Sequence, residues 1–326
     1  MKSLLLFLKQ WILVIAAIIG MLFHSHIAKV AFLSPYLLVI MLIFTFIGMA
    51  PKEMRFRPLH GVLFLCQMAG CFLVYRILLP WNELAACSAC LCMLTPAAAA
   101  ASTVTSMMGG SVGVAAAYIL LDNLALTVAA PFIIPLIAPG HTDMPILLSM
   151  WQVFAKVAPV MLLPLAVAWS MRAWTPKLAE KVQQKRIVAY YLWAFVMMTV
   201  VATAFEQVDK FGEDSTYMIV TLAGTGFVLC ILEFIAGKGI GSLFGQRIAA
   251  GQSLGQKNIL ISMWLCMHYL PLPIVICLAS HSITQNTINA VQIALYERKL
   301  KRTDFPLKVG AQKQAAQDTG GTDIQP

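Results

Sequence analysis

The residues best suited to chemistry lie in the stretch Met93–Asn123, MLTPAAAAASTVTSMMGGSVGVAAAYILLDN. This apolar stretch contains Pro96 and a run of small residues, and it ends on Asp122 and Asn123. Its hydroxyl side chains include Ser102, Thr103 and Thr105. Small residues let backbones approach closely, a proline frees backbone carbonyls, and an acid in an apolar segment is costly enough to indicate function. The stretch therefore predicts half of a substrate-binding site.

The composition of the whole chain is that of a protein embedded in a lipid bilayer. Of its 326 residues 60% are hydrophobic and 11% are charged, and the mean hydropathy is +0.81, whereas soluble domains carry about 25% charged residues. We expect an all-α membrane protein with about ten transmembrane helices in one bundle. The expected spans are approximately residues 10–25, 29–49, 59–79, 84–108, 111–138, 145–170, 186–205, 216–236, 246–267 and 269–296.

The positions of the charged residues predict the orientation of these spans. Most of the 23 basic residues fall in segments that are cytoplasmic if the N-terminus is inside, and the acidic loop Glu206–Asp214 falls outside. The positive-inside rule then favours a bacterial-type cytoplasmic (inner) membrane protein with both termini in the cytoplasm. The net charge of +9 is explained by topology, so we expect no nucleic-acid partner.

The cysteines and the known catalytic motifs indicate neither a cofactor nor an enzyme. All eight cysteines lie in apolar stretches, which does not fit a disulfide framework. The cluster Cys87, Cys90 and Cys92 has the softness to bind a metal or metalloid, but no matching His or acid lies nearby, so we expect packing residues and no metal site. The sequence has no HExxH, GxSxG or similar catalytic arrangement on a plausible face.

The ten expected spans divide into two halves that we predict to be inverted repeats. Residues 1–140 form the first five-helix repeat, 145–296 the second, and 297–326 a disordered basic cytoplasmic tail. An odd number of spans in each half gives the halves opposite orientations. The polar run GQSLGQKN interrupts the ninth span as Pro96 interrupts the fourth, each about 10–15 Å deep in the membrane. Its candidate binding residues are Gln252, Ser253, Gln256, Lys257 and Asn258.

Both interrupted spans resemble those of a known family. LTPAAAAASTVTSMMGGSVGVA is similar to the Pro-small-small pattern, with a later Ser/Asn and Gly, of the bile acid:sodium symporter (BASS) family, and GQSLGQKNILI resembles that family's acid-x3-Gln-Asn pattern. The resemblance extends over nearly the whole chain by span order, but about 30 residues carry the motifs. It implies broken helices four and nine that cross in mid-membrane. It also implies transport of an organic anion, usually driven by two sodium ions.

The sequence departs from the family pattern at the expected sodium ligands. When Asn258 is placed on the family's Asn, Ser253 stands at the acid and Lys257 at the Gln. A shift by one residue places Gln256 on the Gln and Gln252 on the acid, and neither alignment supplies a carboxylate. The first-half ligand positions fall on Ala101, Ser102, Ala115 and Ile119. We therefore expect no pair of sodium sites.

Lys257 offers a physical replacement for sodium, because its ammonium supplies a permanent positive charge. Burial disfavours the charged form of a lysine, so it can also release a proton, and we expect uniport or proton-coupled transport. Asp122 and Lys156 are interpreted either as an ion pair or as a proton relay. Glu233 is expected near the inner end of its span, where it reaches Arg247 or water, and His268 near an outer end.

The sequence thus predicts a secondary active transporter or facilitator of a small organic anion, of bile acid or carboxylic acid type, that works by alternating access. One alternative is a metalloid or arsenite-type efflux carrier, for which Cys92 would be the thiol close to the crossing. Another is a non-transporting membrane receptor. The expected partners are the organic anion and the lipid bilayer. Substrate identity, transport direction and oligomeric state are left open.

Overall fold

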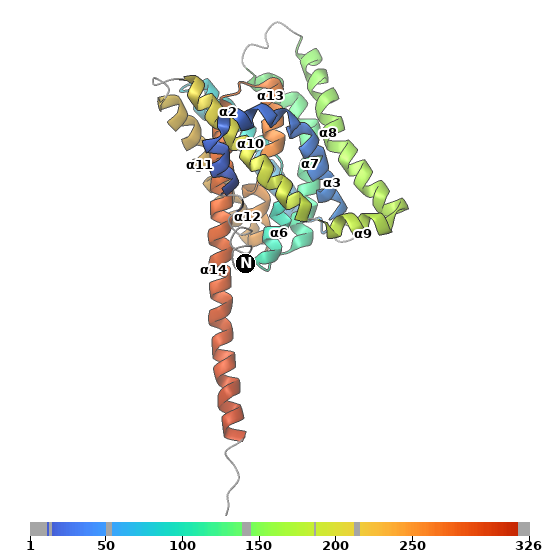
Figure 1. The fold of residues 1–326 in the computed structure, drawn as a ribbon, viewed down its shortest axis with the longest axis vertical. Helices are drawn as coiled ribbons and strands as arrows, with labels where there is room; N and C mark the ends of the chain where they lie inside the picture. The colour runs from blue at the N-terminus through green and yellow to red at the C-terminus, as the bar shows by residue number, and fades with distance from the viewer. Residues whose placement is uncertain are drawn as a thin grey trace, which may run out of the picture. The chain divides into compact units, whose positions relative to one another are not determined.

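The structure is a computed structural model that describes residue 12 and residues 15–49, 54–138, 145–185, 187–211 and 216–318 (Figure 1). In this part of the chain all named elements are helices, as the sequence predicts. They are α2 (His24–Ile27), η1 (Ala28–Leu33), α3 (Ser34–Ile47), α4 (Pro58–Leu78), α5 (Glu83–Leu94), α6 (Ala100–Met107), α7 (Val112–Ile137), α8 (Ile146–Trp174), α9 (Pro176–Gln184), α10 (Ile187–Phe211), α11 (Thr216–Leu243), α12 (Arg247–Gly255), α13 (Ile259–Tyr269) and α14 (Ile274–Asp318).

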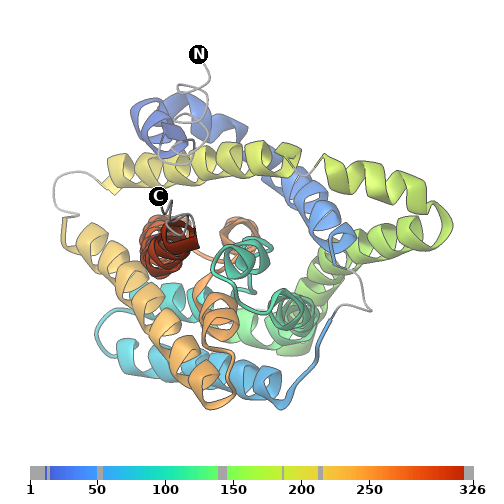
Figure 2. The ribbon, with the colours of Figure 1, turned by 90° about the horizontal axis from the view of Figure 1, so that it is seen from below.

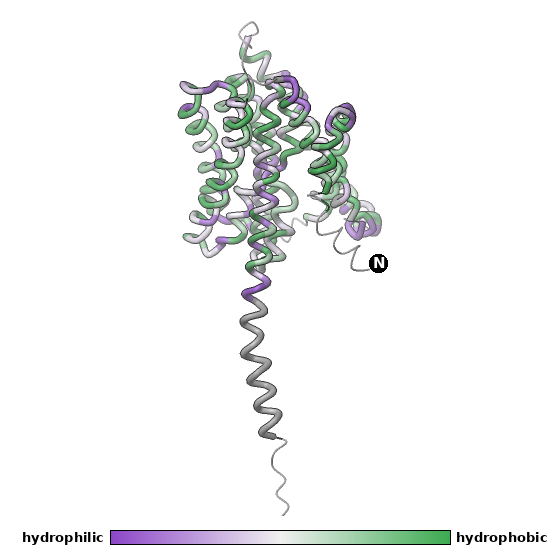
Figure 3. The backbone as a smooth tube through the Cα atoms, turned by 60° about the vertical axis from the view of Figure 1, so that its left-hand side comes forward, coloured by the Kyte–Doolittle hydropathy of each residue, from purple (hydrophilic) through white to green (hydrophobic). Residues whose placement is uncertain are grey.

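Several of these helices have the length and composition of membrane spans, so the chain is an integral membrane protein. Among the described residues five helices are long and apolar enough: α4, α7, α8, α11 and the segment Tyr191–Lys210 of α10. The pair Ile15–Leu22 and His24–Leu33, bent by 88°, is a sixth candidate. In Figure 3 apolar residues follow much of the length of the helices. The total of ten spans stays a prediction.

The chain divides into two compact units, Met1–Gln285 and Asn286–Pro326, and the candidate site belongs to the first. The helix α14 begins in the first unit and continues to Asp318 in the second, through part of the segment for which the composition predicts disorder. The loop at residues 139–144, where the two predicted repeats meet, lies outside the described residues. The predicted repeat boundaries are therefore untested.

Within the first unit, α6, α7, α12 and α13 lie inside a ring formed by α4, α8, α10 and α11 (Figure 2). Burial agrees with this arrangement, since 61% of the most apolar window of α7 is buried, against 17% for α4. Small residues on α11 let α12 pack closely against it. A Cβ atom on Gly237 would lie 2.5 Å from the carbonyl oxygen of Ala250, so only glycine, which has a hydrogen atom in place of Cβ, fits at this position. This close packing fixes α12 inside the ring.

Two of the inner segments are broken helices. The first, α5, ends at Leu94 and α6 begins at Ala100; the second, α12, ends at Gly255 and α13 begins at Ile259. Before Pro96 the backbone is extended, with Thr95 at ψ 130°, because the proline ring disfavours helical geometry in the preceding residue. At 1.5 Å per residue each of these helices is about 12–18 Å long. None of the four is long enough to cross a membrane alone.

Candidate functional site

The two helix breaks meet and pair through their backbones. Ala97 and Lys257 face each other in an isolated antiparallel bridge. The amide N–H of Ala98 donates to the carbonyl of Gln256 at 2.8 Å, and that of Asn258 donates to the carbonyl of Pro96 at 2.8 Å. Each break thus satisfies polar backbone groups that the other exposes, which is what buried irregular backbone requires.

Side chains from later helices hold the outward-facing backbone groups of the two bridged residues. On the first break, Asp122 Oδ2 accepts from Ala97 N at 2.8 Å and Asn123 Nδ2 donates to Ala97 O at 3.4 Å. On the second, Gln285 Oε1 accepts from Lys257 N at 2.9 Å and its Nε2 donates to Lys257 O at 3.2 Å. In both bridged residues the backbone N–H and the backbone C=O are therefore hydrogen-bonded by side chains of a later helix.

The two breaks also resemble each other in a second set of side-chain contacts, made one turn earlier on the same helices. The Tyr118 hydroxyl donates to Gln67 Oε1 at 2.8 Å, and Gln67 Nε2 donates to Asp122 Oδ1 at 3.0 Å. On the other side His281 Nε2 lies 2.7 Å from Glu233 Oε2. Tyr118 stands four residues before Asp122, and His281 four residues before Gln285. The two residues of each pair lie on the same face of their helix, one turn apart. Asp122 and Gln285 bind the breaks, while Tyr118 contacts α4 and His281 contacts α11.

Lys257 is buried next to an acid. Its Nζ lies 3.5 Å from Glu233 Oε1 and donates to the carbonyl of Met93 at 3.2 Å. Lys257 is 1% exposed and Glu233 is 3% exposed, so their attraction acts where water screens it little. The predicted position of Glu233 was wrong: it does not lie near Arg247 or water. The helix α11 continues to Leu243, which places Glu233 well inside the helix.

Of the two alternatives for Asp122 and Lys156, the ion pair is wrong, because the two side chains have other partners. Both oxygens of Asp122 accept hydrogen bonds from Ala97 and Gln67. The side chain of Lys156 is exposed and lies 5.6 Å above the ring of Tyr269. Asp122 therefore belongs to the crossing, where it grips the first break, and Lys156 does not.

Several buried polar atoms around the crossing have no hydrogen-bond partner in the structure. They are Thr105 Oγ1, Asn123 Oδ1, Ser253 Oγ and both amide atoms of Gln256. These residues are at most 2% exposed and lie on or next to α6, α7 and α12, which contact one another. Folded proteins leave few buried polar groups without partners. These atoms are therefore available to a ligand or to ordered water.

The other predicted site residues have different roles. Pro96 and Asn258 build the crossing through their backbones. The hydroxyl of Ser102 donates to the carbonyl of Ala99 at 2.9 Å, and Thr103 is exposed. Gln252 is fully buried, and its carbonyl accepts from the backbone of α12 one turn later. The crossing thus gathers most of the predicted residues, whereas Ser102 and Thr103 lie on the more open face of α6.

The three clustered cysteines on α5 point to separate partners. Cys87 donates to a backbone carbonyl of α7 at 2.8 Å. The sulfur of Cys90 lies 2.6 Å from that of Cys71, and the sulfur of Cys92 lies 3.6 Å from that of Cys277. The described residues contain no group of three or more His, Cys, Asp or Glu suited to a metal ion. The cluster in sequence is not a cluster of ligands in space.

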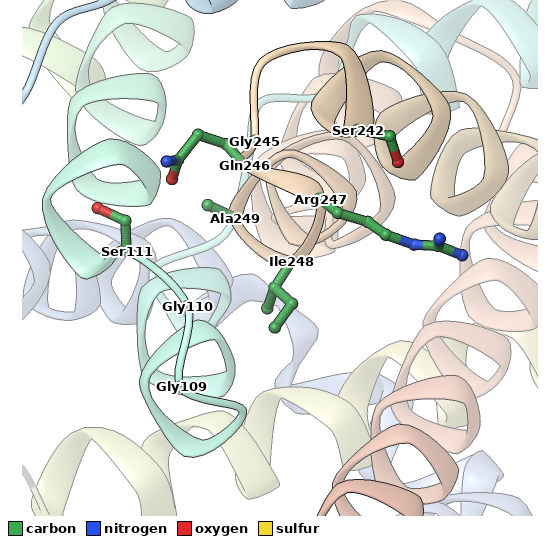
Figure 4. Close-up of a pocket in the computed structure, with 9 residues that line it drawn as sticks. All are labelled: Gly109, Gly110, Ser111, Ser242, Gly245, Gln246, Arg247, Ile248 and Ala249. Atoms are coloured by element: carbon green, nitrogen blue, oxygen red, sulfur yellow. The ribbon is translucent and has the colours of Figure 1, made fainter.

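An open hollow lies at the opposite end of α12 from the crossing (Figure 4). Its volume is about 680 Å³, and it is lined by the α6–α7 turn at residues 109–111 and by residues between Ser242 and Ala249. Both turns contain a glycine at positive φ, Gly109 at 70° and Gly245 at 65°. In Figure 4 the side chain of Arg247 points away from Ser111. The nine residues of α12 span about 13 Å at 1.5 Å per residue, which separates this hollow from the crossing.

Four residues of the crossing were missed by the sequence analysis. They are Gln67, Tyr118, His281 and Gln285. They lie on three helices, Gln67 on α4, Tyr118 on α7, and His281 and Gln285 together on α14. The spacing of His281 and Gln285, one helical turn apart within the last expected span, was a signal that could have identified them.

Comparison with protein-family models gives no match to this chain, and comparison with curated proteins finds no similar protein.

Proposed function

We propose that this protein is a secondary active transporter or facilitator of a small organic anion, of bile acid or carboxylic acid type. The substrate binds where the two broken helices cross, and one helix bundle rocks against the other to give alternating access. The proposed architecture is that of the BASS family, with ten spans in two inverted repeats. The membrane is a bacterial-type cytoplasmic membrane with both chain termini inside, and the protein is not an enzyme.

The observation that carries the proposal is the set of unpartnered polar atoms at a crossing of broken helices. The amide of Gln256 offers both a donor and an acceptor, and the hydroxyls of Thr105 and Ser253 offer either. Such groups are costly to bury for structural reasons alone. In transporters built from broken helices, groups of this kind and exposed backbone bind the substrate near the membrane centre.

The repeated contacts around the two breaks support the inverted-repeat architecture. Asp122 accepts a hydrogen bond from the backbone N–H of Ala97, and Gln285 accepts one from that of Lys257. One turn earlier on the same helices, Tyr118 contacts Gln67 and His281 contacts Glu233. In this architecture the corresponding helices of the two halves run in opposite directions. A common ancestor of the two halves would explain why the same positions bear the gripping residues.

The charges at the crossing support transport that does not depend on two sodium ions. Lys257 already places an ammonium beside the crossing, and the position of the family's acid is taken by Ser253 or, in the alignment shifted by one residue, by Gln252. Sodium prefers several oxygen ligands with a compensating negative charge, and here Lys257 neutralises the nearest acid, Glu233. In the proposed orientation the hollow of Figure 4 opens to the cytoplasm and serves as an entrance to the crossing, about 13 Å away.

Uptake by the purified protein in proteoliposomes tests this function. A panel of labelled organic anions, including taurocholate, pyruvate and pantoate, is presented with a sodium gradient, with a proton gradient, or with neither. We expect saturable uptake and counterflow of one or more probes without sodium. Uptake that rises steeply with the sodium gradient would contradict the proposed ion dependence. Binding without counterflow would indicate a receptor.

The variant Gln256→Leu separates the site from the fold. Because the Gln256 amide has no partner within the protein, we expect the variant to melt at the same or a higher temperature while uptake falls at least tenfold. Thr45→Val is the matched control, since the Thr45 hydroxyl donates to the carbonyl of Met41 in its own helix at 2.8 Å. Full uptake by Gln256→Leu would remove the crossing from the substrate path.

A further inference from the structure

We propose that Glu233 and His281 form the proton-binding site that couples transport, because protonation of Glu233 releases Lys257 to bind the anionic group of the substrate. One proton then moves with one anion. This inference rests on the proposed function and assigns its coupling ion to particular residues.

Glu233 is the shared partner of two basic side chains. Its Oε2 lies 2.7 Å from His281 Nε2, a hydrogen-bond distance, and its Oε1 lies 3.5 Å from Lys257 Nζ. Oε1 has no hydrogen-bond partner, and neither has His281 Nδ1. The contact with His281 is therefore the closer of the two, and the longer ion pair with Lys257 is the one that exchanges its partner in this proposal. The two unpartnered atoms are the places where a proton can be added.

The charges explain how proton and anion are linked. While Glu233 is ionised, it neutralises Lys257, and an anionic substrate must compete with a buried carboxylate. When a proton bonds to Glu233 Oε1, the carboxylate becomes a neutral acid and Lys257 is left as a buried cation without a counter-ion. An unpaired buried charge is unfavourable, and the anionic group of the substrate restores the pair. Proton binding and anion binding therefore strengthen each other by the same factor.

The proton is conserved through the cycle. It arrives from water on one side of the membrane and forms an O–H bond on Glu233, with His281 as the neighbouring donor and acceptor. After the bundle rocks, the anion leaves Lys257, the O–H bond breaks, and the proton returns to water on the other side. Glu233 and Lys257 then pair again. No other co-reactant is needed.

Glu233 lies among several other titratable groups. Besides Lys257 and His281 they include Cys66 on α4, Cys92 on α5, Cys230 on α11, and Tyr118 and Asp122 on α7. Thiols and phenols are ordinarily neutral at pH 7. Asp122 differs from Glu233 because a backbone N–H and an amide already occupy both of its oxygens.

The test uses the full-length protein in sodium-free proteoliposomes with a pH-sensitive dye enclosed. With the probe that is transported, we expect an inward proton gradient to accelerate wild-type uptake at least tenfold and uptake to acidify the lumen. Glu233→Gln mimics the protonated acid, so we expect its counterflow to be independent of pH and its uptake to leave the lumen pH unchanged. Glu180→Gln, which removes an exposed acid on α9 outside the crossing, is the control, and we expect it to retain the pH dependence.

A second measurement does not depend on any variant folding. Wild-type protein in detergent and dilute buffer is mixed with the same probe, and we expect the protein to take up about one proton per anion bound. Wild-type transport that is indifferent to pH, or anion binding without proton uptake, would overturn the coupling and leave the transporter standing. A pH dependence of transport that persists in folded Glu233→Gln would also overturn the proposed coupling. Failure of every probe to move or bind would overturn the proposed function itself.

Discussion

The amide of Gln285 binds both backbone groups of Lys257 at the second helix break, and its removal tests the crossing directly. In Gln285→Leu the backbone N–H and C=O of Lys257 both lose their side-chain partner, at contacts of 2.9 and 3.2 Å. A buried polar group left without a partner costs about 1–3 kcal/mol. Two such groups make the expected loss roughly 2–6 kcal/mol, which is a large part of a typical stability of about 5–15 kcal/mol.

Thermal unfolding in detergent micelles measures this loss, and hydrogen exchange followed by mass spectrometry locates it. We expect faster exchange in peptides that contain Lys257 and unchanged exchange in α4. Thr284→Val is the matched control on the same helix, because the hydroxyl of Thr284 donates to the carbonyl of Ser280 one turn earlier, at 2.8 Å. The reasoning is refuted if Gln285→Leu unfolds within about 0.5 kcal/mol of the wild type, the range of an ordinary surface substitution.

Three further predictions concern the helices around the site. A membrane-permeant diazene oxidant should link Cys71 to Cys90, whose sulfurs lie 2.6 Å apart, and intact mass should then fall by two hydrogen atoms; complete alkylation of both thiols after treatment would contradict this. Gly237→Ala should lower the melting temperature by an amount equivalent to about 1–3 kcal/mol of overpacking, whereas Gly239→Ala, which has open space around it, should not. Asn82→Ala should cost about 1 kcal/mol in unfolding assays, because the Asn82 side chain caps α5 at 2.8 Å; equal stability would exclude that cap.

The sequence contains strong signals for the membrane helices and for the two interruptions. Long apolar runs mark α4, α7, α8 and α11 because a lipid environment requires them, and Pro96 and the polar run before Asn258 mark the breaks because both disturb helical hydrogen bonding. That the breaks touch at Ala97 and Lys257 depends on packing between segments distant in sequence. The prediction that both breaks lie equally deep in the membrane is consistent with this contact, but it did not identify the bridged residues.

The remaining errors have physical causes. Glu233 was placed near a membrane surface because the apolar run weakens at the glycines that follow, yet α11 continues as a helix to Leu243 and those glycines serve close packing against α12. An ion pair of Asp122 with Lys156 was one of two alternatives because their spans are neighbours in sequence. In the folded chain a peptide N–H and an amide satisfy the acid, and such partners leave no charge pattern in the sequence.

The two breaks share a geometry but differ in where they place an acid. On the first, the acid Asp122 grips the backbone and the amide of Gln67 faces a tyrosine. On the second, the amide of Gln285 grips the backbone and the acid faces His281. An acid that accepts a peptide N–H has its charge stabilised by that bond, whereas one oxygen of the acid beside histidine and lysine has an ion-pair contact with Lys257 at 3.5 Å and no hydrogen bond.

This exchange of acid and amide follows from what a coupled carrier requires. Alternating access by rocking requires similar hydrogen bonds at both breaks, because the crossing must stay intact in the inward-facing and the outward-facing conformations. Coupling to one proton needs a titrating centre on one side alone, since a second would change the number of protons carried. The single variant Asp122→Asn should therefore keep the pH dependence of whatever transport it retains, whereas Glu233→Gln should lose it. Loss of pH dependence in folded Asp122→Asn would mean that Asp122 also exchanges a proton during transport.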